Sequence, residues 1–291
     1  MEKILTEIFI FVDEFCKIFA DELKINSLPA STTRRHITRK PGLSISEIVT
    51  ISIMYSFSPC KNFKFYYATC VKKSDFPGKV SYQRFIELQP RVLPVMASLA
   101  SSCKGEETGK YFIDATNIPI CHNKRTGSNK VFKGLAKLGK STMGWFYGFK
   151  LHLAINQKGE IMNLSITKGN TSDVSMVETL MKNLVGKLYG DKGYISDKLA
   201  ARLINKGLQL VTGIKKNMKN KLMEISDKIM LRKRSLIETI FDYLKNKFNL
   251  NHTRHRSPIN FMIHLCATLV AYQFKKNKPA ISYGNLKSIT F

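Results

Sequence analysis

Apolar residues in the first hundred positions recur at three- and four-residue steps, which is the spacing of amphipathic helices. The predicted helices lie at residues 1–25, 44–57 and 61–71 and beyond residue 81. Ser44 and Glu47 have the spacing of a capping box, which predicts where the second helix begins. We therefore expect residues 1–108 to form an all-helical domain. It is either a helix-turn-helix-like DNA-binding unit or a helical packing or dimerisation domain.

The pattern changes near Gly109 to short apolar runs that are typical of strands. The predicted strands lie at residues 111–116, 145–155, 160–167, 187–190 and 208–213. The predicted helices lie at residues 174–185, 198–205, 231–248 and 261–274. Asp173 stands directly before the first of these helices, where a carboxylate can cap the backbone. A helix cap and a metal ligand are the two roles that its position allows, and the cap is the simpler one.

This succession of elements, β-β-β-α-β-α-β-α, predicts an α/β fold. It matches a ribonuclease H-like mixed five-stranded sheet with helices on both faces. In that layout the first strand is central, the fourth strand lies beside it, and a later helix packs across their ends. We assign this ribonuclease H-like fold to residues 109–275 and a basic tail to residues 276–291.

The net charge of the chain indicates a polyanionic partner. The 291 residues hold 47 Lys and Arg against 21 Asp and Glu, a formal net charge of +26. No acidic residue occurs between Asp114 and Glu160, a span that includes Lys133 and Lys140. Such a surface suits a polyanion, because lysines and arginines displace the counterions condensed on nucleic acid. The alternative is a generally basic protein that has no such partner.

Cysteine usage and hydropathy bear on the compartment. The six cysteines are scattered without a C-x-x-C pair, which argues against a zinc knuckle or disulfide framework and indicates a reducing cytoplasm. The longest apolar run, around residues 261–274, is too short to span a bilayer. We expect a cytoplasmic protein with no membrane partner.

Three carboxylates are placed where they can act together. Asp114 lies inside an apolar strand, and Asp191 follows a strand end within Gly-Asp-Lys-Gly. Glu238 lies on the amphipathic helix of residues 231–248. A carboxylate in a buried strand is costly unless it is paired or binds a metal. Oxygen-only ligands suit Mg²⁺, with Mn²⁺ as a substitute, and two such ions support in-line attack on a phosphodiester.

Arg234, Glu238 and Lys245 are four and seven residues apart, which places them on one stripe of that helix. Taken alone, this stripe reads as a solvated face with ordinary ion pairs. Asp242 follows Glu238 by one turn, so it is either a spare metal ligand or an ion-pair partner of Lys245, and we favour the ion pair.

Gly134-Leu-Ala-Lys-Leu-Gly-Lys-Ser141 fits the pattern of a phosphate-binding loop, but a strand rather than a helix is predicted after it. We therefore expect no nucleotide cofactor, and interpret the segment as a basic loop touching DNA or a plain hairpin connection. Trp145 follows at the start of the next strand. It is either a core residue, which the aromatic strand favours, or a platform for a DNA base.

Asp114, Asp191 in Gly-Asp-Lys-Gly-Tyr194, and Arg234-x3-Glu238-x6-Lys245 resemble the Asp-Asp-Glu (DDE) triad and the Tyr-Arg-Glu-Lys signature of bacterial insertion-sequence transposases. Nearly the whole chain is similar to the insertion sequence 982 family. Three further segments carry that likeness, namely residues 130–136, 144–152 and 252–258. One departure is that Leu231 stands at the tyrosine position of the signature, which is expected to help contact DNA near the cut.

The resemblance implies a DNA transposase of a bacterial insertion sequence, associated with the nucleoid. Such an enzyme hydrolyses phosphodiesters at terminal inverted repeats, and the freed 3′-hydroxyl then attacks target DNA. Two Mg²⁺ ions held by the triad and a homodimer in the synaptic complex are implied as well. The residues expected to contact DNA are Arg234, Lys245, Lys192, Arg254, Arg256, Lys133 and Lys140. The alternatives are a catalytically decayed or repurposed DNA-binding protein and a host nuclease of the same fold.

Overall fold

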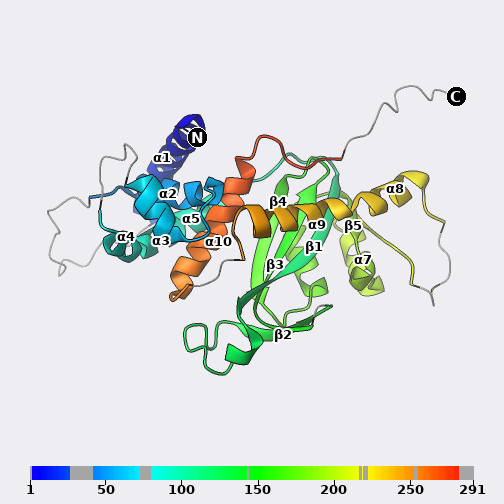
Figure 1. Ribbon diagram of the computed structural model, residues 1–291. Coiled ribbons are helices and arrows are strands. Elements are labelled where there is room, and N and C mark those ends of the chain that lie inside the picture. The colour runs from blue at the N-terminus through cyan, green and yellow to red at the C-terminus, as the bar shows by residue number, and fades with distance from the viewer. Residues whose placement is uncertain are drawn as a thin grey trace. The chain divides into compact units, whose positions relative to one another are not determined.

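The computed structural model describes residues 2–26, 42–72, 80–142, 144–215, 218, 222–251 and 255–281. The chain divides into two compact units, which Figure 1 shows. Unit 1 comprises Met1–Ser102 and Lys247–Phe274, and unit 2 comprises Cys103–Asn246 and Lys275–Phe291. The predicted domains differ from these units, because they place the last helix with the catalytic fold.

Unit 1 is helical. Its helices are α1 (Glu2–Asn26), α2 (Ile45–Phe57), α3 (Phe63–Tyr66), α4 (Tyr82–Leu88), α5 (Leu93–Ser102) and α10 (Pro258–Gln273). The predicted capping box opens α2: the Glu47 N–H donates to Ser44 Oγ at 3.1 Å, and the Ser44 N–H donates to Glu47 Oε2 at 2.6 Å. Helix α10 is apolar on nearly all sides and packs against α2 and α5, which is why the segment Lys247–Phe274 joins this unit. No helix among the described residues is long and apolar enough to cross a membrane.

Unit 2 is built on a mixed sheet. Its strands are β1 (Lys110–Cys121), β2 (Lys137–Ser141), β3 (Gly144–Asn156), β4 (Ile161–Lys168), β5 (Gly186–Gly190) and β6 (Leu208–Thr212). The strands β4-β3-β1-β5-β6 form the predicted arrangement, with β1 central, β5 parallel beside it and β3 antiparallel on its other side. The ribonuclease H-like α/β fold is therefore confirmed.

The sheet has a sixth strand that sequence reasoning missed. Strand β2 lies where a loop or hairpin connection was predicted, and it pairs with β3 over Gly144–Gly148. Strand β4 pairs with the following stretch of β3, Phe149–Ile155. Both strands therefore share one edge of the long β3.

Helices cover both faces of this sheet, as predicted. Residues alternate between faces along a strand, so Tyr111 and Ile113 point one way, into a core with α6 (Val177–Leu180) and α7 (Asp197–Ile204). Residues of the other parity face α8 (Ile225–Lys233) and α9 (Ser235–Asp242). Tyr189 shows this, because its hydroxyl donates to Asp227 Oδ1 on α8 at 2.8 Å.

Two predicted helices differ from the structure. The helix expected at 174–185 is only a 3-10 turn followed by the single turn α6, because the backbone leaves the helical region at Met181 and is left-handed at Asn183. The helix expected at 231–248 consists of the end of α8, then α9, then a π-helical segment, Tyr243–Lys247. Helices α8 and α9 meet at Arg234 in a tighter turn, since its N–H donates to the carbonyl of Leu231, three residues back.

Candidate active site

Asp114 and Asp191 lie at the same end of neighbouring parallel strands. Strand β1 pairs with β5 only as far as Phe112 and Tyr189, so Asp114 and Asp191 each lie two residues beyond the last paired position. Beyond that point the β5 side of β1 is open, and the N–H of Ala115 donates to Asp114 Oδ1 at 2.8 Å instead of to a strand. The sheet therefore places the two carboxylates next to each other at an open edge.

Glu238 joins them from α9, which packs on β1. Arg234 links the groups: its Nη2 donates to Glu238 Oε1 at 3.0 Å and its Nη1 to Asp114 Oδ2 at 3.4 Å. Asp114 has the same parity along β1 as Phe112, so its side chain belongs to the face on which α9 lies. The predicted helix surface that carries Arg234 and Glu238 thus faces the carboxylate of Asp114 on β1.

The charges of these side chains oppose one another. Burial, together with the nearby carboxylates of Asp191 and Glu238, raises the pKa of Asp114 to about 6, although the Ala115 N–H and Arg234 act to lower it. Three mutually repelling carboxylates form an oxygen-only donor set of the kind that divalent cations stabilise. Within the described residues no three acidic, histidine or cysteine side chains converge as a finished metal centre, and the Arg234 guanidinium contacts two of these carboxylates. The donor chemistry fits a hard cation.

Tyr194 is a neighbour of this site that sequence reasoning did not single out. Its ring is buried, and a side chain at Gly190 would come within 3.2 Å of it, so the glycine allows the close packing. Burial raises the pKa of the Tyr194 hydroxyl, and the carboxylates of Asp114, Asp173 and Asp191 raise it further. The Gly-Asp-Lys-Gly-Tyr motif was the available signal, although it said nothing about burial.

Of the residues expected to contact DNA near the triad, Lys192 is exposed directly after Asp191. Lys245 lies in the π-helical segment and is half-buried; burial lowers its pKa, and Asp242 acts in the opposite direction. Asp242 accepts a hydrogen bond from Asn246 at 2.5 Å. The effect of Asp242 on the pKa of Lys245 is therefore the sign of the favoured ion pair, while the hydrogen bond of Asp242 goes to Asn246.

The remaining basic candidates lie elsewhere in the chain. Lys133 and Lys140 are exposed on unit 2, Lys140 on β2 with its Nζ 5.9 Å from the centre of the Trp145 ring. Trp145 is 57% exposed, so the expectation of a core residue is wrong: its cross-strand partner is the exposed Lys140 of β2, not an apolar core residue. Arg256 is exposed on unit 1, and Arg254 lies outside the described residues.

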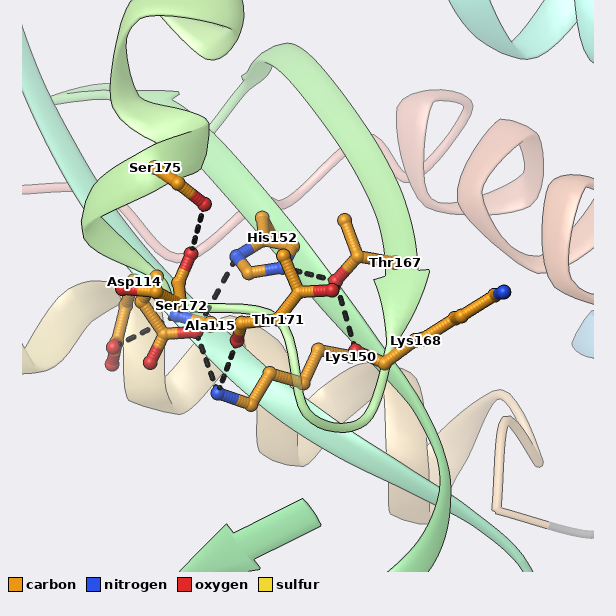
Figure 2. Close-up of polar contacts among 10 residues, drawn as sticks. Asp114, Ala115, Lys150, His152, Thr167, Lys168, Thr171, Ser172 and Ser175 are labelled. Carbon is orange, nitrogen blue, oxygen red and sulfur yellow. Dashed lines mark hydrogen bonds and ion pairs between the residues drawn. The ribbon is translucent and has the colours of Figure 1, made fainter. Parts of the chain in front are cut away.

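Asp173 does not cap a helix. Its side chain makes no capping hydrogen bond and instead accepts one from Lys150 Nζ at 2.9 Å. His152 lies beside this pair, and its buried ring contacts Thr167, as Figure 2 shows. The cap prediction is wrong because the strongest partner of Asp173 comes from a strand 23 residues earlier in the chain, which local sequence rules do not reach. The alternation of Lys150 and His152 along β3 was the available signal.

A family model described as a transposase DDE domain matches residues 104–258, which is more than half of the chain. The chain belongs to this family of DNA transposases, whose DDE domain is a metal-dependent DNA nuclease and strand transferase. Membership of the insertion sequence 982 family in particular stays a prediction. A search of curated proteins finds no match.

Among solved structures, the chain is similar to a piggyBac transposase determined by cryo-EM as a synaptic complex with hairpin DNA. The TM-score is 0.50 and the sequence identity 9%, and the alignment covers 94% of this chain and 72% of that chain. At this identity the likeness is one of fold, and it supports the ribonuclease H-like assignment of unit 2.

Proposed function

We propose that Asp114, Asp191 and Glu238 are the catalytic triad of this transposase and that they hold divalent metal. The observation that carries the proposal is the open edge of β1, where the strand continues past β5 and sets Asp114 beside Asp191, under an α9 that supplies Glu238. The raised pKa of Asp114 agrees with it, because that carboxyl lies among like charges. Two Mg²⁺ ions, replaceable by Mn²⁺, would lower the pKa of the attacking water and stabilise the leaving oxygen.

The substrates we assign are the terminal inverted repeats of an insertion sequence and its target DNA, brought together by a homodimer. The triad serves hydrolysis at the element ends, after which the freed 3′-hydroxyl attacks the target phosphodiester. A supercoiled plasmid carrying the DNA that flanks this gene tests this directly. Metal-dependent cuts at inverted-repeat borders are the expected result, whereas cuts without defined ends would favour a host nuclease, and binding without cuts a decayed transposase.

Lys245 is expected to bind a phosphate of the element end. Replacing Lys245 with Ala should weaken end binding about tenfold to a hundredfold, since a charge-assisted hydrogen bond contributes about 1.5–3 kcal/mol. It should also reduce the slope of log K against log salt by about 0.9, the value for one lost phosphate contact. Fluorescence anisotropy of labelled DNA across a salt series measures both. Lys247→Ala, two residues further along and exposed, is the matched control. An equal loss of affinity in Lys247→Ala would show that Lys245 contributes only to the overall positive charge and does not bind a particular phosphate.

Trp145, with Lys133 and Lys140, is expected to lie against bound DNA. Because Trp145 is the only tryptophan in the chain and is largely exposed, its fluorescence reports on this surface alone. Saturating DNA should quench the emission through contact with the bases. Lys140→Ala should weaken binding and shift the quenching curve to higher DNA concentration, whereas Lys206→Ala, an exposed lysine in the turn after α7, should not. Unchanged emission at full binding would place DNA elsewhere.

A further inference from the structure

Two nitrogen donors converge on one carboxylate oxygen on the α6 side of the sheet. Lys150 Nζ lies 2.9 Å from Asp173 Oδ1 and also donates to the carbonyl of Thr171 at 3.0 Å. His152 Nδ1 lies 3.7 Å from the same oxygen of Asp173. Lys150 and His152 alternate along β3, so their side chains leave the sheet on the same face, as Figure 2 shows. The two side chains form a cradle for one negatively charged oxygen.

The hydrogen bonds of His152 indicate which nitrogen carries its proton. Its Nε2 lies 2.7 Å from Thr167 Oγ1, whereas that hydroxyl is 3.4 Å from the carbonyl of Lys168. The Thr167 hydroxyl can donate either to the Lys168 carbonyl or to Nε2, and the carboxylate of Asp173 that faces Nδ1 favours the arrangement with the ring proton on Nδ1. Nδ1 is buried and has no hydrogen-bond partner among the described residues, although it faces Asp173. A buried donor without a partner is costly, so this nitrogen is suited to an acceptor that comes closer than Asp173 does.

The donors and their present acceptor differ in exposure. The side chain of His152 is 1% exposed and that of Lys150 13%, whereas that of Asp173 is 40% exposed. The two nitrogen donors of the cradle are therefore fixed in the protein, while its carboxylate lies at the surface in contact with solvent. An ion pair with one solvated partner contributes little to stability, so another anion can replace it at small cost.

The cradle lies in the electrostatic neighbourhood of the triad. The buried hydroxyl of Tyr194 is influenced by Asp173 as well as by Asp114 and Asp191. In the sheet, His152 pairs with Ala115, the residue that follows Asp114. Asp114 leaves β1 on the α9 face and the cradle lies on the α6 face, so the two groups lie on opposite faces at the same end of the sheet.

We infer that Lys150 and His152 form a binding site for a DNA backbone phosphate near the cut, and that Asp173 occupies this site with its own carboxylate until DNA displaces it. The inference rests on the proposed function, because it takes the ligand from the DNA substrate. A phosphate oxygen can accept from both an ammonium and an imidazole N–H, whereas among the described side chains the Asp173 oxygen accepts only from the Lys150 ammonium. The site adds one phosphate contact to those expected from Arg234 and Lys245.

The test is the affinity of the full-length protein for duplex DNA from the element ends, measured without divalent metal. Asp173→Asn keeps the shape of the side chain but removes the competing charge, so binding should become about threefold to tenfold tighter. Lys150→Met should weaken binding and lower the salt slope by about 0.9. In the double variant the gain from Asp173→Asn should vanish, because the gain requires Lys150.

Glu178→Gln is the matched control, since Glu178 is a carboxylate paired with Lys206 and Arg202 on the surface of the same unit. Glu178→Gln removes one negative charge, as Asp173→Asn does, but leaves Lys150, His152 and Asp173 unchanged. An affinity gain in Asp173→Asn no larger than in Glu178→Gln, or a loss of affinity in Asp173→Asn, would overturn the inference. A merely structural role for Asp173 predicts that loss, together with a lower melting temperature. Failure of the wild-type protein to bind element ends would instead overturn the proposed function.

Discussion

Glu238→Gln is expected to abolish DNA cleavage while DNA binding persists. The change removes one negative metal ligand but keeps the shape of the side chain, and a bound metal contributes several kcal/mol to a phosphoryl transition state. A loss of about 4 kcal/mol corresponds to about a thousandfold in rate. Cleavage of the element-end plasmid with Mg²⁺ measures this, and anisotropy of labelled ends measures binding.

The stability of the Glu238→Gln variant should change little. Glu238 is 57% exposed, and its ion pair with Arg234 is of the surface kind that contributes at most about 1 kcal/mol. Asp242→Asn is the matched control, one turn further along the same helix and exposed. Near wild-type cleavage by the Asp242 variant is expected. Cleavage by Glu238→Gln at the wild-type rate would show that the glutamate is not a ligand, and a large loss in Asp242→Asn would restore its alternative role as a spare ligand.

Asp114→Asn is expected to make the metal-free protein more stable and catalytically dead. The pKa of Asp114 in the fold is about 6, against an ordinary value of 3.8, so the folded state prefers the protonated carboxyl. The stabilisation from that proton is full below about pH 4 and is lost as the pH rises through about 6. Near pH 7 the ionised group therefore costs the fold about 3 kcal/mol, from roughly two pKa units at 1.36 kcal/mol each. The amide removes this cost.

Urea denaturation of wild type and Asp114→Asn at pH 5 and pH 7 measures this effect. The difference between the two proteins should be larger at pH 7, and added Mg²⁺ should stabilise the wild type but not the variant. Asp242→Asn again serves as the control, since its exposed carboxylate should give no such difference. Equal stability of Asp114→Asn and wild type at pH 7 would mean that the charge of Asp114 is already compensated in the metal-free fold.

The parts of the fold that local sequence determines were predictable. Ser44 and Glu47 close their capping box within four residues, and the strand ends near Asp191 and Gly207 are marked by glycines. Strand β2 was missed because Lys137-Leu-Gly-Lys-Ser141 is short and polar, and only its pairing with β3 makes it a strand. Pairing partners are non-local, so propensity alone does not reveal them.

In the candidate site, too, features that depend on local sequence were predictable, and those that depend on non-local contacts were not. The triad could be proposed because each carboxylate stands at a recognisable point of the pattern, in a strand, after a strand or on a helix. The partners of Asp173 could not, because Lys150 and His152 reach it across two strands and a loop. The exposure of Trp145 likewise depends on its non-local neighbour in the sheet, the exposed Lys140 of β2.

The division of the chain into units has a consequence for synthesis. Unit 1 takes its central helix α10 from residues that follow the main segment of unit 2, so Met1–Ser102 leaves the ribosome without the helix that fills its core. The sheet of unit 2 can form while unit 1 is still open, because domains fold in the order in which they are translated. A protein truncated before Pro258 would therefore expose the apolar faces of α2 and α5. Nonsense mutations late in the gene should therefore yield products that proteases degrade, even though these products still contain all three residues of the proposed triad.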